Sequence, residues 1–229
     1  MYSEAVAVAA EKCAEDTKGQ TCYICTQALH WKTKEGLVRM CACRGTAGFA
    51  HVSCLAEQAK ILFAEAEENN LDISARFQRW HTCSLCEQYY HGVVYCALGW
   101  ACWKTYLARP ERDRARIAAM TELGIGLFAA QRHADALSVQ EADLATLRRI
   151  GATESSILDV QSNLANTYEK LGRSEEALQM QRDVYSGRSR INGEENFVTL
   201  TAANNYAFTL VVRLQPVSYT HLTLPTNCV

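Results

Sequence analysis

The sequence predicts a small α+β module, followed by a longer all-α solenoid of paired helices, so that the chain is mostly α-helical. Three observations predict this fold class. Cysteine and histidine residues fall into four close pairs between Cys22 and Cys86. A helical apolar period begins after Cys54. From Glu111 onward the sequence repeats itself at a spacing of 41 or 42 residues, which is typical of a solenoid.

The four pairs define the first module. They are separated by fifteen, seven and twenty-eight residues and read Cys22-x2-Cys25, Cys41-x-Cys43, His51-x2-Cys54 and Cys83-x2-Cys86. Zinc takes four thiolate or imidazole ligands in a tetrahedron, and two close ligands can reach one ion from a single turn. Four pairs therefore predict two zinc ions. Buried thiols without metal would not fall into such pairs, and nothing in the sequence directs the chain to the compartments where disulfides form.

The order of the pairs, with the run 41–46, resembles the RING-CH variant of the RING finger family. The resemblance implies an interleaved cross-brace with two structural ions. It assigns one ion to Cys22, Cys25, His51 and Cys54, and the other to Cys41, Cys43, Cys83 and Cys86. The plant homeodomain finger has the same ligand order and is the close competitor. The short spacings inside the second pair and before the histidine fit RING-CH better.

Composition excludes several functional classes. The 229 residues are 48% hydrophobic and 21% charged, with a net charge of −2, which is ordinary for a globular protein. Neither half of the chain is basic, which argues against a nucleic-acid partner. The N-terminus does not resemble a signal peptide, and no apolar run is long enough to span a membrane. We therefore expect a cytoplasmic location.

The chain is expected to divide into five segments. These are an N-terminal segment 1–20, the finger 21–90, a connecting helix 91–110, the repeats 111–215, and a non-native tail 216–229. The insertion 71–82 is expected to cover the zinc core with Phe77 and Trp80. The apolar run after Cys86 predicts a buried helix that ends at Arg109-Pro110, because the residue before proline disfavours helix.

The repeats can be aligned residue by residue. Leu123-Gly124 matches Leu164-Ala165, and Asn163 matches Asn205. The unit 165–178 resembles a tetratricopeptide repeat, and the long period resembles the kinesin-light-chain type. The resemblance covers residues 114–214, as two complete repeats and the first helix of a third. A solenoid that stops after one helix is expected to expose an apolar face.

The segment 217–226 has neither helical period nor repeat character. It resembles a translated sequencing-library adaptor, and the alternative is a polar tail. We exclude the residues after about Gln215 from fold reasoning, as is done for other non-native segments.

The RING-CH resemblance implies an E3 ubiquitin ligase that binds a ubiquitin-charged E2 enzyme and has no covalent catalytic residue of its own. Ile24 and Leu85, each just before a ligand cysteine, match the family's apolar E2 contacts. Two positions depart from the family. Gln58 stands where tryptophan is frequent, and Glu87 stands where a basic residue is expected. Trp80 is a candidate replacement for that tryptophan in E2 binding.

The tetratricopeptide resemblance implies a peptide or protein partner. Asn163 and Asn166 lie three residues apart, so they share one helix face, and Asn205 repeats Asn163. Side-chain amides can hold a peptide backbone through paired hydrogen bonds. The alternative is that these residues pack or cap helices.

Different functional classes stay open at this point. One is an E3 ligase whose repeats recruit the substrate, and another is a non-enzymatic scaffold with structural zinc. A third is a histone-tail reader of the plant homeodomain type, for which Tyr23 and Trp31 would begin an aromatic cage.

Overall fold

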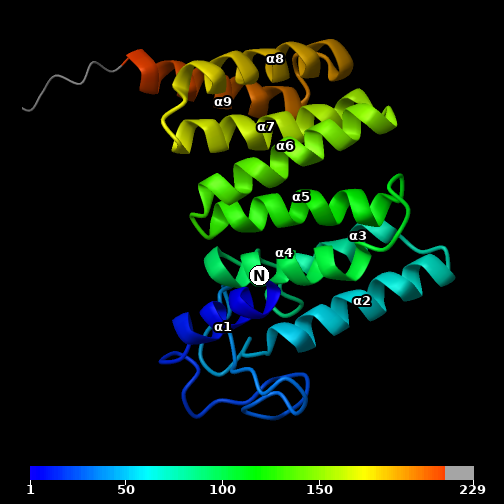
Figure 1. Cartoon of the computed structure of the whole chain (residues 1–229), viewed down its shortest axis with the longest axis vertical. Helices are drawn as coiled ribbons and strands as arrows, with labels where there is room; N and C mark the ends of the chain where they lie inside the picture. The colour runs from blue at the N-terminus through cyan, green and yellow to red at the C-terminus, as the bar shows by residue number, and fades with distance from the viewer. Residues whose placement is uncertain (215–229) are drawn as a thin grey trace, which may run out of the picture.

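Figure 1 shows the computed structural model, which describes residues 1–214. The predicted tail 216–229 lies outside the described residues. Helices dominate the described part. They are α1 (Tyr2–Lys12), α2 (Val52–Glu68), α3 (Ile73–Phe77), the short 3-10 helix η1 (Gln78–Trp80), α4 (Gly92–Tyr106), α5 (Arg114–Ala129), α6 (His133–Ile150), α7 (Glu154–Lys170), α8 (Ser174–Asn192) and α9 (Phe197–Leu214).

The predicted fold class is confirmed, because a finger-like region precedes a stack of paired helices. Within residues 1–214 the β component is limited to two isolated bridges, Val38 with Ala50 and Thr82 with Tyr89. The rest of the finger consists of turns held by the backbone, from which α2 emerges directly after His51. Before α2, the finger therefore has little regular secondary structure, and its side-chain clusters must hold it together.

Helix α4 forms the core that the finger and the repeats share. It packs against α1 and α2 on the finger side and against α5 on the repeat side. Gly99 and Gly126 lie where α4 and α5 cross. A methyl group on Gly99 would meet the backbone of Glu122 and Leu123, and one on Gly126 would meet the Cα of Cys96 at 3.0 Å. The two helices therefore touch backbone to backbone.

Helices α5 to α9 form antiparallel pairs, α5 with α6 and α7 with α8, and α9 packs against α8. The turns inside the two pairs are equivalent. Gln131 and Gly172, 41 residues apart, both take positive φ, at 61° and 75°. The small residues Ala136 and Ala177 are fully buried at 0% exposure, which lets the paired helices approach closely. These contacts explain the sequence period.

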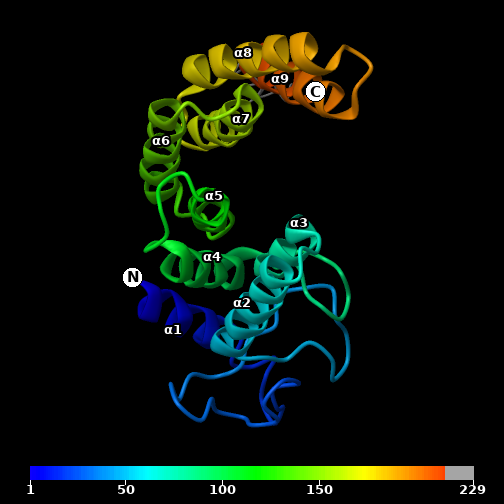
Figure 2. The same cartoon turned by 90° about the vertical axis from the view of Figure 1, so that its right-hand side faces the viewer.

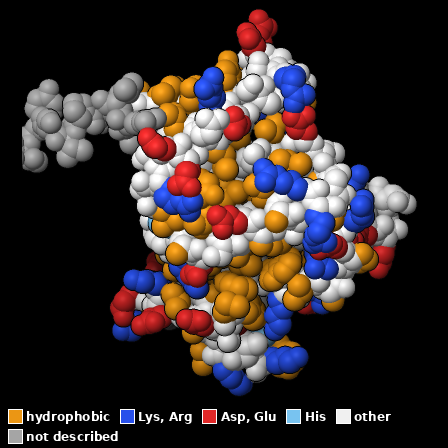
Figure 3. All heavy atoms as spheres, turned by 45° about the horizontal axis from the view of Figure 1, so that its top comes forward, with side chains coloured by type: hydrophobic (Ala, Val, Ile, Leu, Met, Phe, Trp, Pro, Cys, Tyr) orange, Lys and Arg blue, Asp and Glu red, His pale blue; other side chains and the backbone are white. Residues whose placement is uncertain are grey.

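Figure 2 shows that α4 to α9 form an arc, with α3 projecting from the finger on its concave side. Helix α9 carries an apolar face without a cover among the described residues, since Leu200, Phe208 and Val211 are each more than half exposed. On the face drawn in Figure 3, acidic and basic side chains are mixed without a continuous basic stripe. None of the helices within residues 1–214 is long and apolar enough to cross a membrane.

Candidate metal centres and partner-binding surface

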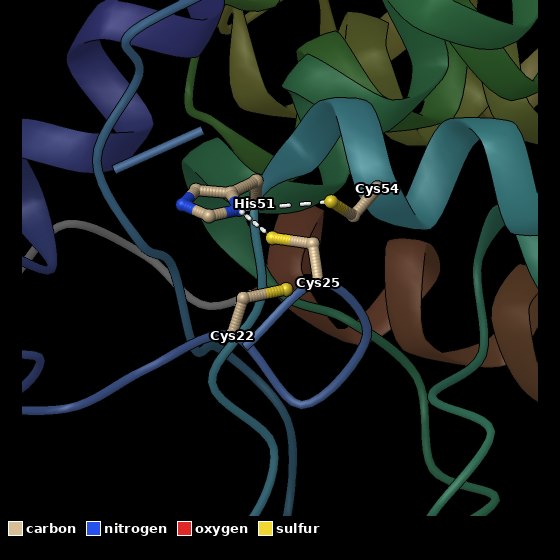
Figure 4. Close-up of side chains that lie close together, drawn as sticks. All are labelled: Cys22, Cys25, His51 and Cys54. Carbon is tan, nitrogen blue, oxygen red and sulfur yellow. Dashed lines mark hydrogen bonds between the residues drawn. The ribbon is translucent and has the colours of Figure 1, made fainter. Parts of the chain in front are cut away.

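The first cluster joins Cys22, Cys25, His51 and Cys54, whose ligand atoms all lie within 4.8 Å of one another. Figure 4 shows the four side chains converging, with both loop cysteines opposite the start of α2. The Nδ1 atom of His51 lies 3.3 Å from the Sγ of Cys25 and 3.6 Å from the Sγ of Cys54. Cys54 lies on the first turn of α2, three residues after His51. This spacing puts the two side chains on the same side of the helix start.

The second cluster joins Cys41, Cys43, Cys83 and Cys86, again with all sulfurs within 4.8 Å. The Sγ atoms of Cys43 and Cys83 lie 3.7 Å apart, although the residues are 40 positions apart in the chain. The first and third pairs thus meet in one cluster and the second and fourth in the other. This is the interleaved grouping that the RING-CH resemblance implies.

The distances fit a tetrahedral metal ion. With metal–sulfur bonds of about 2.3 Å and metal–nitrogen bonds of about 2.0 Å, tetrahedral angles place two sulfurs about 3.8 Å apart and sulfur about 3.5 Å from nitrogen. The observed separations lie close to both values. A disulfide would need about 2.05 Å between sulfurs, and all the cysteines of residues 1–214 are free.

The tautomer of His51 also fits a metal ligand. Its Nε2 atom lies 3.4 Å from the carbonyl oxygen of Ala28, which can only accept a hydrogen bond. Nε2 therefore carries the proton, and the lone pair is on Nδ1, the nitrogen that faces the sulfurs. A ligand histidine commonly makes such an outer hydrogen bond, which fixes the orientation of its ring. The His51 side chain is fully buried.

The first and last cysteine pairs form the same local turn. Thr26 N–H donates to the carbonyl of Cys22 at 2.8 Å, and Glu87 N–H donates to that of Cys83 at 3.0 Å. Thr26 and Glu87 both have positive φ, at 60° and 57°. In each turn, the N–H group two residues after the first cysteine also points at the sulfur of that cysteine. The nitrogen of Ile24 lies 3.4 Å from the Sγ of Cys22, and the nitrogen of Leu85 lies 3.4 Å from the Sγ of Cys83. Both turns are therefore shaped to surround an anionic sulfur.

Ionisation of the four cysteine thiols in the second cluster would require a bound cation. The hydrogen bond between Cys41 and Cys83 raises the pKa of Cys41 and lowers the pKa of Cys83 to about 4. Without a metal ion, the Cys41 thiol would therefore donate a hydrogen bond to the Cys83 thiolate. Four sulfurs so close together can all ionise only around a positive ion, which is the condition for thiolate ligation.

The two turns present Ile24 and Leu85 on the surface, with 37% and 51% of each residue exposed. A short polar chain links the turns beneath them. The hydroxyl groups of Tyr23 and Ser84 share a hydrogen bond of 3.0 Å, and Ser84 donates to Oε1 of Gln58 at 3.4 Å. Gln58, on α2, therefore takes part in joining the two turns.

A groove beside Ile24 has a volume of about 400 Å³. Trp31 and Ile61 form part of its wall, and they are 68% and 48% exposed. The loop that carries Trp31 is attached to α2 by Glu35, whose carboxylate accepts from both the N–H and the hydroxyl of Ser53 at 2.7 and 2.9 Å. From the sequence, Trp31 was considered only for an aromatic cage, and Ile61 was not predicted as a contact residue. Ile61 could have been found as an apolar residue on the polar side of α2.

Glu87 is not a free charge. Arg79 from η1 lies 3.1 Å from its carboxylate and also donates to the carbonyl of Cys83 at 3.5 Å. The guanidinium beside the last turn therefore comes from a position eight residues earlier in the chain. Sequence position alone could not reveal this pair, because it depends on how η1 packs against the turn.

The prediction that Trp80 replaces the missing tryptophan at the E2 surface is corrected by its burial. Only 1% of Trp80 is exposed, and its ring packs edge-on against Tyr106 of α4, with centroids 5.8 Å apart. Phe77 lies in the same cluster. The insertion 71–82 therefore covers the α2–α4 interface, a separate cluster from the one that contains the ligand cysteines. A side chain so deeply buried has no surface to offer a partner.

The three predicted peptide-contact residues lie on the first helices of their repeats, Asn163 and Asn166 on α7 and Asn205 on α9, all partly buried. Asn166 accepts a hydrogen bond from Nε2 of Gln181 at 3.2 Å, which is a packing role within its repeat. As for an aromatic cage, the hydroxyl of Tyr23 is engaged with Ser84, and the ring neighbour of Trp31 is His30 at 6.1 Å.

Comparison with known proteins agrees with this geometry. Residues 22–86 match the RING-variant domain family, and residues 115–190 match the tetratricopeptide repeat family. A search of curated proteins finds no match. Among solved structures, the chain is similar to the crystal structure of BtubC (BKLC) from P. vanneervenii, with 13% identity and a TM-score of 0.52.

The match to BtubC covers 72% of this chain and 66% of that chain, and at this identity it shows the fold alone. The family matches place a RING-variant domain before tetratricopeptide repeats, so the predicted architecture is confirmed. With its two cysteine and histidine clusters, the chain is a zinc-finger protein of the metal-binding and protein-interaction class.

Proposed function

We propose that the protein is an E3 ubiquitin ligase whose finger binds a ubiquitin-charged E2 enzyme and whose repeats bind a substrate or partner protein. The observation that supports this most directly is the pair of matching turns. They hold Ile24 and Leu85 exposed on either side of the Tyr23–Ser84–Gln58 link. The groove with Trp31 and Ile61 extends this apolar surface along α2.

The metal in both clusters is proposed to be zinc, with Cys22, Cys25, His51 and Cys54 around one ion. A set of thiolates with one imidazole is typical of a structural zinc site, and four protein ligands leave no position for a reactive water. The ions would stabilise the fold of the finger and take no part in chemistry. Free thiols also suit the reducing cytoplasm, where we place the protein.

The mechanism that follows is catalysis by orientation. The nucleophilic groups in the groove lining are already engaged, since the Ser53 hydroxyl donates to Glu35 and Cys54 belongs to the first metal cluster. We therefore assign the attack on the E2–ubiquitin thioester to the substrate amine. The finger would hold the E2 while the repeats hold the substrate, which raises the effective concentration of the amine at the thioester.

The test uses the full chain with a panel of E2 enzymes, measuring ubiquitin transfer and metal content in one preparation. Ile24→Ala and Leu85→Ala are expected to reduce transfer at least ten-fold while two zinc ions stay bound. Leu29→Ala is the matched control, because Leu29 is 59% exposed on the finger but outside the groove. If Ile24→Ala transfers ubiquitin as well as the unchanged protein, the proposed E2 surface is wrong.

The second candidate is a non-enzymatic scaffold in which the finger ends a repeat array. The ion pair of Arg79 and Glu87 favours it, since it neutralises the charge beside the last turn, where the RING-CH resemblance expects a free basic side chain. Two bound zinc ions without transfer by any E2 would support the scaffold. Peptide contacts by Asn163, Asn166 and Asn205 belong to both candidates and would be tested by alanine substitution in a binding assay.

A further inference from the structure

A pocket lies at the junction between the finger and the first repeat, and none of the residues of the two metal clusters lines it. Three elements enclose it: the end of α2, the inserted α3–η1 segment, and the first turns of α5. Its volume is about 400 Å³, within the range of ligand pockets. Figure 2 shows α3 on the concave side of the arc, on the same side of the picture as α9.

The floor of the pocket is apolar and rigid. Phe63 and Phe77 line it, and their rings pack edge to face at 5.7 Å, both against Tyr106 beneath. The two phenylalanines are 3% and 9% exposed, so they are held in place by the core. Ala115 and Ala118 of α5 complete the wall with small side chains, which leaves room for a bulky group.

The rim carries three charges, and two of them are already engaged. Glu67 forms a two-pronged pair with Arg109, with both contacts at 2.6 Å. Asp113 caps α5, accepting from the N–H groups of Ala115 and Arg116.

The third charge, Arg114, is exposed and takes part in none of the hydrogen bonds or ion pairs found within residues 1–214. The side chains of Ser74 and Gln78 on the same rim are exposed and equally without a partner there. The carboxylates of the rim are therefore already engaged, and the groups left for a ligand are one unpaired cation and two neutral hydrogen-bonding side chains around an apolar floor.

We propose that this pocket binds a peptide segment of a partner protein, which inserts one bulky apolar side chain and places an acidic residue beside Arg114. The apolar side chain would lie on Phe63 and Phe77. The hydroxyl of Ser74 and the amide of Gln78 would bond the peptide backbone. A carboxylate satisfies Arg114 through charge-assisted hydrogen bonds. This inference concerns binding alone and does not depend on ligase activity.

A peptide is favoured over other occupants by the shape and charge of the site. A buried aromatic floor surrounded by a polar rim is the usual form of an anchor pocket at a protein interface. Arg114 is the unpaired cation of the rim. An acidic residue next to the anchoring side chain in the peptide would form an ion pair with it. The exposed Ile73, 40% accessible on α3, extends the apolar surface beyond the pocket mouth.

The test measures binding of fluorescein-labelled heptapeptides to the full chain by anisotropy. The central residue is varied through all amino-acid types, and its neighbours are aspartate, serine or lysine. Binding is expected only with a large apolar centre, and best with aspartate neighbours. Arg114→Glu should weaken the aspartate-flanked peptides at least ten-fold and strengthen the lysine-flanked ones.

Arg112→Glu is the matched control, since it makes the same charge change two residues away, on an exposed side chain outside the pocket lining. Ala118→Trp should abolish binding by filling the pocket, with metal content and circular dichroism reporting that the fold is kept. The inference is overturned if no peptide binds, if the centre does not matter, or if both arginine variants behave alike. A dimer in sedimentation that Arg114→Glu dissociates would assign the pocket to a second copy instead.

Discussion

At the residue scale, Asp143 is an acidic side chain inside the first repeat. It is 2% exposed on α6, and among residues 1–214 its side-chain partner is the hydroxyl of Thr121, which donates at 2.8 Å. Burial raises the pKa of Asp143 to about 6, against a smaller opposing effect of that hydrogen bond. Near neutral pH the protein therefore carries a buried carboxylate with little compensation.

The raised pKa of Asp143 makes the free energy of unfolding fall as the pH rises. Because the folded pKa lies above that of the unfolded chain, the contribution of Asp143 is most favourable below about pH 4 and is lost as the pH rises through about 6. Asp143→Asn should remove this dependence and raise the free energy of unfolding at pH 7 by about 1–3 kcal/mol. Urea unfolding of both proteins from pH 4 to pH 7.5 measures the difference. Parallel stability curves for the two proteins would contradict it.

The second prediction about a single residue concerns Trp31, whose exposed ring is expected to contribute to E2 binding. An exposed tryptophan beside an apolar groove is typical of a residue that dominates binding. Trp31→Ala should weaken E2 binding about ten-fold and leave the melting temperature within about one degree, since the ring is 68% exposed. Titration calorimetry with the best E2 of the panel measures this. Equal affinity for the variant would remove Trp31 from the proposed surface.

At the element scale, the α4–α5 crossing decides how the finger and the repeats join. Gly99→Ala places a methyl group 3.0 Å from the carbonyl oxygen of Glu122, and Gly126→Ala places one 3.0 Å from the Cα of Cys96. Backbone atoms cannot move aside as side chains can. Each change should therefore lower the free energy of unfolding by about 1–3 kcal/mol, despite the better helix propensity of alanine.

The control for this prediction is Gly187→Ala in α8. Its methyl group would meet the ends of the flexible Leu158 side chain at 2.8 Å, so the neighbour can adjust. We expect a smaller loss of stability there, measured by chemical denaturation under the same conditions. If all three variants lose the same stability, close backbone contact is not what holds α4 against α5.

At the scale of the whole molecule, the metal clusters and the repeats stabilise different parts. Residues 13–51 contain hardly any regular structure, so metal–ligand bonds would be their main constraint. The repeats are stabilised by contacts between successive helices. Removing the metal should therefore unfold the finger and loosen α1 and α4, while α6 to α9 stay helical.

Hydrogen–deuterium exchange before and after a chelator would check this expectation. The amides of residues 22–54 should lose protection, and the amides of α7 and α8 should keep theirs. Refilling with zinc should restore the original pattern. Complete loss of helical circular dichroism on chelation would show instead that the two parts fold as one cooperative unit.

Much of the architecture follows from the sequence alone, because its signals are local or periodic. The ligands come in pairs one or two residues apart, so each half-site is visible within a single turn, as in Cys22-x2-Cys25. The repeats are visible because equivalent helices bury equivalent faces, as Ala136 and Ala177 do. The RING-variant and tetratricopeptide architecture could therefore be predicted.

Contacts between distant residues were decided only by the tertiary structure. Trp80 looked like a surface replacement for an absent tryptophan, but packing against Tyr106 buries it. Arg79 neutralises Glu87 because η1 folds back on the last turn. The junction pocket exists because α2, α3 and α5 meet there. Spacing along a chain determines what one turn or one repeat can do, whereas burial, ion pairing and cavities depend on which elements are brought together.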